Sequence, residues 1–265
     1  MREMLFSLLA IGMMATTVWA QDPPPPADVK RITMTTGFDV LTAYVFRGIH
    51  QESDGVVLQP PLDVGIALGK GVTANFGNWY SLHSGPSGSF YEADLYGSVT
   101  FSAGKLKPGV LYTAYSSPNA RFRTVNEVAA ILALDDSGSA FPLAPKATVA
   151  FELAGQADGG AKRGTYLELA MRPAIKLVDA KYIVNLAIPV RLGTSLKDYY
   201  ESPQGNDRFG FFSSGLVASI PITTRSVTWD FHGGVDLLWL GENMKALNSD
   251  DGFKPVGIIG VTLVY

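Results

Sequence analysis

The sequence predicts an all-β fold, a transmembrane antiparallel up-and-down β-barrel of about twelve strands that follows an N-terminal signal peptide. Three observations predict it. Apolar and polar residues alternate with a period of two along most of the chain. Polar, glycine-rich turns separate the alternating segments, and the last segment ends on an aromatic residue, Tyr265.

The start of the chain has the features of a cleavable signal peptide. Arg2 gives a positive start, and residues 5–14 are an apolar run that is too short for a membrane-spanning helix. Val18-Trp19-Ala20 has the small-x-small pattern of a cleavage site. We therefore expect residues 1–20 to be removed by cleavage after Ala20.

The rest of the chain divides into a spacer and one domain. Residues 21–30 contain four consecutive prolines, which favour an extended polyproline II segment and exclude a strand, so we expect a periplasmic spacer there. Residues 31–265 remain for the barrel, and all-β folds of this length are often single domains.

The composition excludes several classes of protein. The chain has no cysteine, which excludes a disulfide framework, a cysteine metal site and lipid attachment at cysteine. Its net charge of -3 gives no basic surface for nucleic acid. Charged residues make up 17% of the chain, against roughly 25% in soluble proteins. After the signal peptide no apolar run reaches the ~18 residues of a transmembrane helix.

Alternation locates the strands. We expect them to start near residues 32, 56, 72, 91, 106, 124, 146, 165, 180, 208, 226 and 253. If the amino terminus is periplasmic, the mostly long connections all lie on the extracellular side: those near Gly48, His83, Pro118, Gly155, Lys197 and Glu242. Short turns such as residues 69–71 lie on the other side, where 135–145 is a long exception. The exact register between Pro118 and Lys162 stays open.

Alternation alone does not show which row of side chains faces outward. A secreted β-sandwich or lipocalin-like barrel, the main alternative fold, would place the apolar row inside. Here the charges share a row with Gly, Ala and Ser. Aromatic residues also recur near the predicted strand ends, as in an interfacial girdle: Tyr44, Phe46, Tyr80 and Trp239. The row that carries Leu95, Leu186 and Leu237 is therefore predicted to face lipid.

The final strand resembles the signal that Gram-negative barrels present to the barrel-assembly machinery, because Val261 and Leu263 alternate up to the terminal aromatic residue. This predicts a cell outer-membrane location. The expected partners are outer-membrane lipid, the barrel-assembly machinery and small solutes, with no nucleic acid.

The inward row predicts the lumen lining. Strict parity gives these candidates: Asp39, Arg47, Asp63, Glu92, Asp94, Glu127, Glu152, Glu168, Arg172, Arg191, Asp230, His232 and Asp236. With Lys107 and Lys181 added, nine acids face five bases, which favours cations in an open pore. We expect Glu92, Asp94, Glu127 and Glu152 to contribute most to this preference. The alternative is that these charges pair across the barrel and close it.

No catalytic, cofactor or metal site is predicted, and we do not expect an enzyme. His50 and His83 fall in predicted loops and are expected to be solvated. His232 shares a strand face with Asp230, which could orient its imidazole, but no recognisable serine motif accompanies them. Residues 248–252 carry oxygen ligands without the spacing of an EF-hand.

The first predicted hairpin carries a family resemblance. Tyr44-Val45-Phe46-Arg47-Gly48-Ile49, followed by Gln51, Leu58-Gln59 and Leu62-Asp63, resembles the opening of the TorF-type porin-like family of proteobacterial envelope proteins. Residues 90–97 and 164–169 resemble later strands of that family. The sequence departs from the family at Ala43, where an acidic residue is common, and at Pro60-Pro61, where the family has two glycines. The resemblance implies a barrel and a channel, with no particular substrate.

We therefore expect a passive channel for small solutes with a mild preference for cations. A closed structural or adhesive envelope barrel is the alternative, and a lipid-modifying outer-membrane hydrolase is a third possibility. The sequence leaves open the solute, the state of the lumen and the oligomeric state.

Overall fold

The computed structural model describes residues 31–178, 183–202 and 205–265. The predicted signal peptide, the predicted spacer and Lys181 lie outside these residues. Almost all of the secondary structure is β-strand, and the helix α1 (Glu242–Leu247) has 6 residues. No helix in the described part of the chain is long and apolar enough to cross a membrane.

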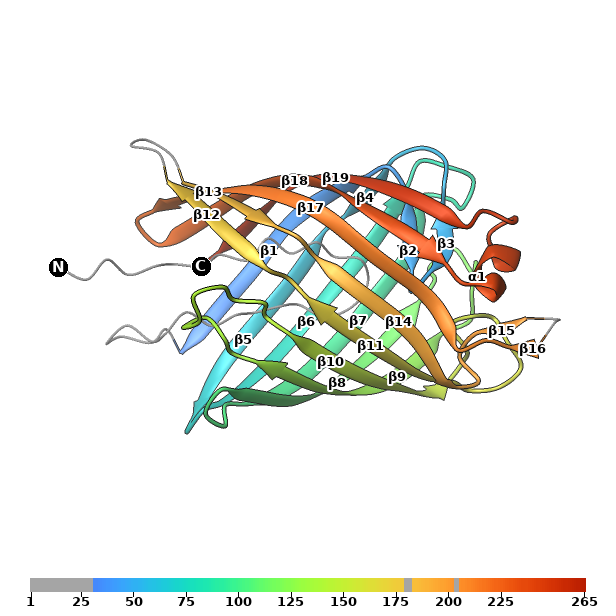
Figure 1. Ribbon diagram of the computed structural model, residues 1–265, viewed down its shortest axis with the longest axis horizontal. Helices are drawn as coiled ribbons and strands as arrows, with labels where there is room; N and C mark the ends of the chain where they lie inside the picture. The colour runs from blue at the N-terminus through green and yellow to red at the C-terminus, as the bar shows by residue number, and fades with distance from the viewer. Residues whose placement is uncertain (1–30, 179–182, 203–204) are drawn as a thin grey trace.

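The main sheet is a closed antiparallel barrel (Figure 1). It contains 15 strand segments, and three pairs of segments continue each other across a break, so that they form 12 barrel strands. The barrel closes where β1 (Ile32–Leu41) pairs with β19 (Phe253–Val264), from Thr35 opposite Val264 to Leu41 opposite Ile258. Closure leaves no free sheet edge, which is the condition for a β-sheet to lie in lipid.

The other barrel segments follow the chain in order. They are β4 (Val57–Gln59), β5 (Pro61–Gly69), β6 (Val72–His83), β7 (Phe90–Phe101), β8 (Leu106–Ser116), β9 (Val125–Leu134), β10 (Lys146–Ala154), β11 (Thr165–Met171), β12 (Ala174–Val178), β13 (Ile183–Ala187), β14 (Val190–Lys197), β17 (Phe209–Thr224) and β18 (Val227–Leu240). Two small hairpins lie outside this sheet: β2 (Tyr44–Phe46) with β3 (Ile49–Glu52), and β15 (Glu201–Ser202) with β16 (Gly205–Asn206). The predicted starts thus locate the barrel strands to within about three residues.

The three breaks coincide with prolines. Pro60 separates β4 from β5, Pro173 separates β11 from β12, and Pro189 separates β13 from β14. Proline has no amide hydrogen to donate to the ladder, so each strand is interrupted at that residue. Pairing continues on both sides, because β4 and β5 both pair with β1 and β6.

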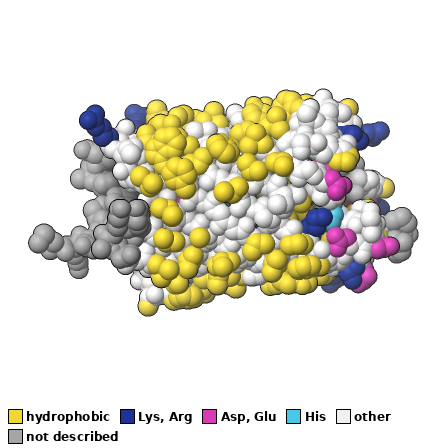
Figure 2. Space-filling view, turned by 90° about the horizontal axis from the view of Figure 1, so that it is seen from above, with side chains coloured by type: hydrophobic (Ala, Val, Ile, Leu, Met, Phe, Trp, Pro, Cys, Tyr) yellow, Lys and Arg dark blue, Asp and Glu magenta, His cyan; other side chains and the backbone are white. Residues whose placement is uncertain are grey.

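The outward face of the barrel is apolar. On β7, Leu95 is 63% exposed while its neighbour Asp94 is 4% exposed, and Ile259 of β19 is 66% exposed. Figure 2 shows hydrophobic side chains along the length of the barrel, with charged side chains gathered near its ends. A soluble barrel would have the opposite arrangement, so the predicted direction of the apolar row is confirmed.

Aromatic side chains gather toward both ends of this apolar surface. Trp239 contacts the rings of Phe212 and Phe253, with centroids 5.7 and 5.4 Å apart, while Trp229 stacks on Phe231 near the opposite end. Amphipathic aromatic rings prefer the membrane interface, so these positions mark the two boundaries of an apolar belt.

The two ends of the barrel differ. We call the end with α1, the two small hairpins and the connections 84–89, 117–124 and 155–164 the long-loop end. The opposite short-turn end has the tight connection at 70–71 and the carboxyl terminus (Figure 1). There the Tyr265 amide donates to the carbonyl of Met34, so the last residue takes part in closing the barrel.

Candidate functional site in the barrel interior

A hairpin lies across the barrel interior at the long-loop end. It comprises residues 44–52, contains β2 and β3, and is called the inner hairpin below. The parity that put Arg47 on the inward row treats residues 38–47 as one continuous strand. This is wrong, because β1 ends at Leu41 and the chain then turns inward. Tyr44 and Phe46, predicted to face lipid in the girdle, are 1% and 6% exposed and point into the protein.

The inner hairpin contacts several strands of the barrel wall. The Tyr44 ring lies 5.5 Å from that of Trp79 on β6, and its hydroxyl donates to Glu92 on β7 at 2.9 Å. The Phe46 ring lies 5.4 Å from that of Tyr115 on β8. Across the barrel, the turn of the hairpin meets β9, β11 and the segment after α1 through contacts described below. The hairpin therefore narrows the lumen at this end.

Arg47 sits at the tip of the inner hairpin in a two-residue turn. Arg47 and Gly48 both have positive φ, 48° and 90°, the combination that suits the twist of paired strands. Glycine adopts this conformation freely, whereas for arginine it costs roughly 1–2 kcal/mol. The strain at Arg47 must therefore be offset by what its side chain and carbonyl contact.

The Arg47 guanidinium occupies a pocket of one carboxylate and three aromatic rings. Its Nη1 and Nη2 atoms donate to the two carboxylate oxygens of Glu127 at 2.7 and 2.8 Å, and Nη1 also donates to the Tyr199 hydroxyl at 2.6 Å. The carbon Cζ lies 4.2 Å from the ring centroid of Tyr166, 5.0 Å from that of Phe46 and 5.3 Å from that of Tyr199. Both partners of the ion pair are almost fully buried.

One polar atom in this pocket has no partner. Nε of Arg47 is buried, and no acceptor reaches it in the part of the chain that the structure describes. A buried donor without a hydrogen bond costs roughly 1–3 kcal/mol. The pocket thus provides acceptors for the two terminal nitrogens of the guanidinium group but none for its Nε atom.

Two further groups hold the backbone of this turn. The Tyr200 hydroxyl donates to the carbonyl of Arg47 at 3.0 Å, and the Asn248 side-chain amide donates to the carbonyl of Gly48 at 2.6 Å. The Asn248 carbonyl oxygen accepts from the amide of His50 at 2.8 Å. The segment 248–252, noted above for its oxygen ligands, thus holds the hairpin through Asn248. Within the described ranges, no group of three or more His, Asp or Glu residues is placed to bind a metal.

Tyr199 and Tyr200 are positioned by the loops of the long-loop end. The Glu201 amide donates to Asp158 at 2.8 Å, and the Glu201 carboxylate accepts from the amides of Ala161 and Lys162 at 2.7 and 2.9 Å. Burial raises the pKa of Asp158 above its ordinary value, although the hydrogen bonds it accepts oppose this. These contacts join the two loops and fix the tyrosines over Arg47.

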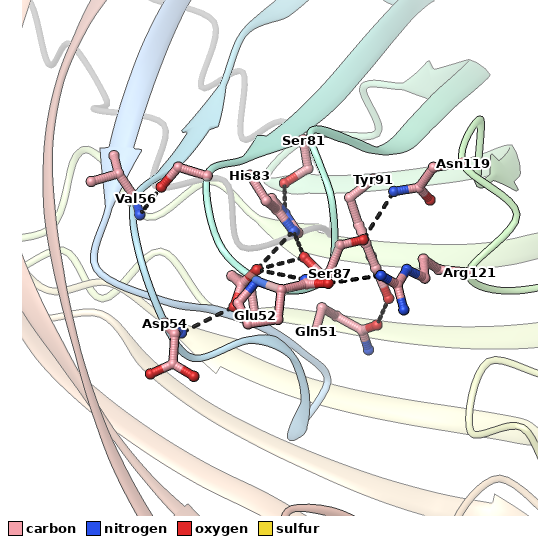
Figure 3. Close-up of polar contacts among 12 residues, drawn as sticks. Gln51, Glu52, Asp54, Val56, Ser81, His83, Ser87, Tyr91, Asn119 and Arg121 are labelled. Carbon is pink, nitrogen blue, oxygen red and sulfur yellow. Dashed lines mark hydrogen bonds and ion pairs between the residues drawn. The ribbon is translucent and has the colours of Figure 1, made fainter.

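The other strand of the inner hairpin is held at Glu52 (Figure 3). The Ser87 hydroxyl donates to Glu52 at 2.6 Å, and the amides of Ser87 and Asp54 donate to the same carboxylate at 3.1 and 3.0 Å. Burial alone would raise the pKa of Glu52, but these hydrogen bonds and the nearby His83 outweigh it and lower the pKa. Gln51 beside it accepts a hydrogen bond from Tyr91.

His83 belongs to this cluster, and the prediction that it is solvated is wrong. It is 5% exposed, its ring stacks on Tyr91 at 4.6 Å, and its Nδ1 atom contacts the Ser87 hydroxyl. Its Nε2 atom lies 2.7 Å from the hydroxyl of Ser81. Serine, histidine and glutamate therefore follow one another, as in a hydrolase, but Ser81 is fully buried and Ser87 stands between His83 and Glu52. The arrangement links the hairpin to the wall.

The structure places the thirteen predicted lumen residues on the inside. All except Arg47 lie on barrel strands or, for Arg172, at the break between β11 and β12, and their side chains are buried or half-buried. Arg47 reaches the interior from the inner hairpin and not, as parity assumed, from a barrel strand. Parity also missed Lys146, which is 7% exposed on β10, because that residue stands at the start of its strand.

Several of these charges are engaged with neighbours. Arg191 donates to Asp236 at 2.5 Å, and His232 Nε2 contacts Asp39 at 2.8 Å. The expected partner of His232, Asp230, offers only its backbone carbonyl, 3.3 Å from Nδ1, so the orienting group is Asp39. The Tyr166 hydroxyl donates to Glu168 at 3.0 Å.

Glu152 serves the loop above it. Its two carboxylate oxygens accept from the amides of Ala157 and Gly164, both at 2.6 Å. This carboxylate therefore shapes the connection between β10 and β11.

Four inward acids keep at least one carboxylate oxygen without a hydrogen bond among the described residues: Asp63, Asp94, Asp230 and Asp236. Asp63 accepts from the Asn75 amide at 2.7 Å through Oδ1, but no donor reaches its Oδ2 atom among the described residues. The same holds for Oδ1 of Asp94, which lies opposite Trp79 on β6. A carboxylate oxygen removed from water is costly, so these oxygens suit a hydrated interior better than a dry one.

Comparison with known proteins supports the fold. No family model matches the chain, and no curated protein matches it, so the likeness to the TorF-type family is carried only by the residues given above. An outer-membrane channel from Pseudomonas putida F1 is similar in structure, with a TM-score of 0.51 and 12% identity over 91% of this chain and 100% of that one. The NanC porin gives 0.48 and 11% over 88% and 98%, and the translocator domain of the autotransporter NalP from Neisseria meningitidis gives 0.44 and 12% over 90% and 89%. The chain has the fold of an outer-membrane β-barrel.

Proposed function

We propose that this protein is a passive outer-membrane channel for small solutes with a mild preference for cations, narrowed by the inner hairpin. The long-loop end would be extracellular, since outer-membrane barrels have short periplasmic turns. The observation that carries the proposal is the presence of Asp63 and Asp94, each with an unsatisfied carboxylate oxygen, inside a closed barrel whose outside is apolar. Such oxygens fit a hydrated path better than a dry core.

The cation preference is attributed to few residues. Glu127 is neutralised by Arg47 and Asp236 by Arg191, and Asp230 interacts electrostatically with Arg172 and His232. Glu152 accepts two loop amides. Of the four acids expected from the sequence to contribute most, Glu92 accepts from Tyr44, and only Asp94 keeps a free oxygen. Asp63 and Asp94 are therefore proposed as the residues that set selectivity.

Reversal potentials in a salt gradient test this assignment. The double variant Asp63→Asn/Asp94→Asn should lose most of the cation preference, whereas Glu152→Gln, the matched control, should keep it. In the parent the preference should fall as salt rises, because the Debye length shrinks from about 10 Å at 0.1 M to about 3 Å at 1 M. A channel whose selectivity follows Glu152 and ignores the two aspartates would refute the assignment.

A closed structural barrel is a second candidate, favoured by one observation. The inner hairpin contacts side chains on β6, β7, β8, β9 and β11, and a plug so placed could seal the lumen. Conductance of the parent in planar bilayers separates the two candidates. The hydrolase has no such support, because Ser81 is buried on the lumen side, away from lipid. Absence of lipid hydrolysis is expected for the parent.

A further inference from the structure

We propose that the pocket around Arg47 is a binding site for solutes that carry a guanidinium group, and that Arg47 is its tethered occupant. A guanidinium solute would displace Arg47 and release the inner hairpin. Only the effect of this release on conductance rests on the proposed channel function, whereas the site and the displacement of Arg47 do not.

The pocket is built by parts of the protein that are distant in sequence. Glu127 comes from β9, Tyr166 from β11 and Tyr199 from the segment after β14, and only Phe46 belongs to the hairpin itself. Glu127 is also held by Tyr115, whose hydroxyl donates to it at 3.3 Å. The carboxylate, two of the rings and the hydroxyl acceptor thus belong to the barrel and its loops, and they remain when Arg47 leaves.

The chemistry of the pocket selects a planar cation. Two parallel hydrogen bonds, 2.7 and 2.8 Å long, join Glu127 to the two terminal nitrogens of Arg47. The guanidinium carbon lies 4.2 Å from the centre of the Tyr166 ring, within the range of a cation–π contact. An ammonium group is a point charge that cannot form the same paired bonds, so guanidinium should be preferred over ammonium.

The tethered occupant fits the pocket imperfectly. Arg47 holds a left-handed backbone conformation with φ of 48°, and its buried Nε atom has no acceptor within the described residues. A free solute carries neither the backbone strain nor the restricted stem. A soluble guanidinium compound can therefore compete, although tethering gives Arg47 a high local concentration.

Cysteine labelling tests displacement without measuring conductance. The chain has no cysteine, so Val45→Cys, at a 1% exposed position on β2, reports the state of the hairpin alone. Millimolar methylguanidinium should raise the rate of reaction with a polar maleimide several-fold and with saturation. Methylammonium at equal ionic strength is the control and should leave the rate unchanged. An equal effect of both ions, or of neither, would overturn the proposal.

Binding to the vacated pocket provides the second test. Calorimetry on detergent-solubilised Arg47→Ala should show saturable binding of methylguanidinium. Adding Tyr166→Leu should weaken it by roughly twofold to thirtyfold, the range of a cation–π contact. Adding Glu127→Gln should abolish it, and persistence of binding in that variant would refute the pocket. If Arg47→Ala does not fold, the labelling of Val45→Cys decides alone.

The two proposals fail separately. If bilayers show no conductance but labelling responds to methylguanidinium, the binding site stands and the channel function is wrong. If cation-preferring conductance is found and labelling does not respond, the channel stands and the displacement of Arg47 is refuted.

Discussion

The barrel interior has two zones, one at the long-loop end and one deeper in the barrel, and their carboxylates have different surroundings. At the long-loop end, Glu127 and Glu52 are buried and hydrogen-bonded: Glu127 binds the tip of the inner hairpin, and Glu52 binds Ser87 from within the hairpin. Deeper in the barrel, Asp63 and Asp94 each keep an oxygen with no donor in the described part of the chain. Carboxylates thus hold the inner hairpin in one zone and keep an unsatisfied oxygen in the other. What decides between these roles is whether a donor from another segment reaches the oxygen.

Removing the inner hairpin should have the largest effect on this contrast. Replacing residues 44–52 with a short Gly-Ser linker should raise single-channel conductance several-fold, because the obstruction to the lumen is lost while the barrel strands remain. Replacing residues 156–163 in the same way is the control and should change conductance less. Equal conductance of the hairpin replacement and the parent would show that the narrow point lies elsewhere.

Removing the partner of Arg47 should strongly destabilise the long-loop zone. Glu127→Gln leaves a buried cation unpaired, and breaking a buried pair in this way costs about 3–5 kcal/mol. The measurement is the temperature at which the folded form is lost on unheated gels. The double variant Arg47→Met/Glu127→Gln should recover much of the loss, because no uncompensated charge remains. A double variant no better than Glu127→Gln would contradict the ion-pair explanation.

The assignment of outward and inward side chains can be tested at adjacent residues of β7. Leu95→Arg should cost about 2–4 kcal/mol if its position is near the bilayer midplane. Asp94→Arg should cost less, because its side chain faces the interior, where several acids can pair with it. Folding yield into lipid vesicles measures both, and similar yields would argue against an apolar outer face in lipid.

Acid should loosen the hairpin, with the smallest effect of the four. Because the pKa of Glu52 is lowered in the folded protein, its contribution to stability is present above the ordinary value of 4.5 and is lost as pH falls through the folded pKa. The rate of maleimide labelling of Val45→Cys, divided by the rate for a free thiol at the same pH, should therefore rise below about pH 4.5. Adding Glu52→Gln should flatten this dependence, and an unaltered profile would assign the effect to another group.

The strands of the barrel wall could be predicted from the sequence, whereas the inner hairpin could not. On β7, alternation separates Leu95 from Asp94, and the row that charges share with Gly, Ala and Ser indicates which of the two faces inward. The inner hairpin alternates as well, so Tyr44 and Phe46 read as a continuation of β1, and neither glycine nor proline marks the exit at Thr42. The dipeptide Arg47-Gly48 was the one local signal of a tight turn.

Partners far apart in sequence explain the remaining errors. No periodicity shows that Arg47 meets Glu127, 80 residues later, or that Asn248 binds Gly48, 200 residues earlier. His83 was assigned to a solvated loop because its neighbours are polar, but those neighbours fold over it together with Glu52. The wall strands can be predicted from local alternation, whereas the position of the inner hairpin depends on contacts that form only when the barrel is closed.

The inner hairpin also has a consequence for the order of folding. Its contacts span 80, 152 and 200 residues of sequence, and the last of them needs the segment that precedes β19. The full set can form only once nearly the whole chain has been laid into the sheet, and contacts at such separations carry a large loop-closure cost. The hairpin should therefore dock late, so that a freshly inserted barrel passes through a wider, leakier intermediate before its outer end tightens.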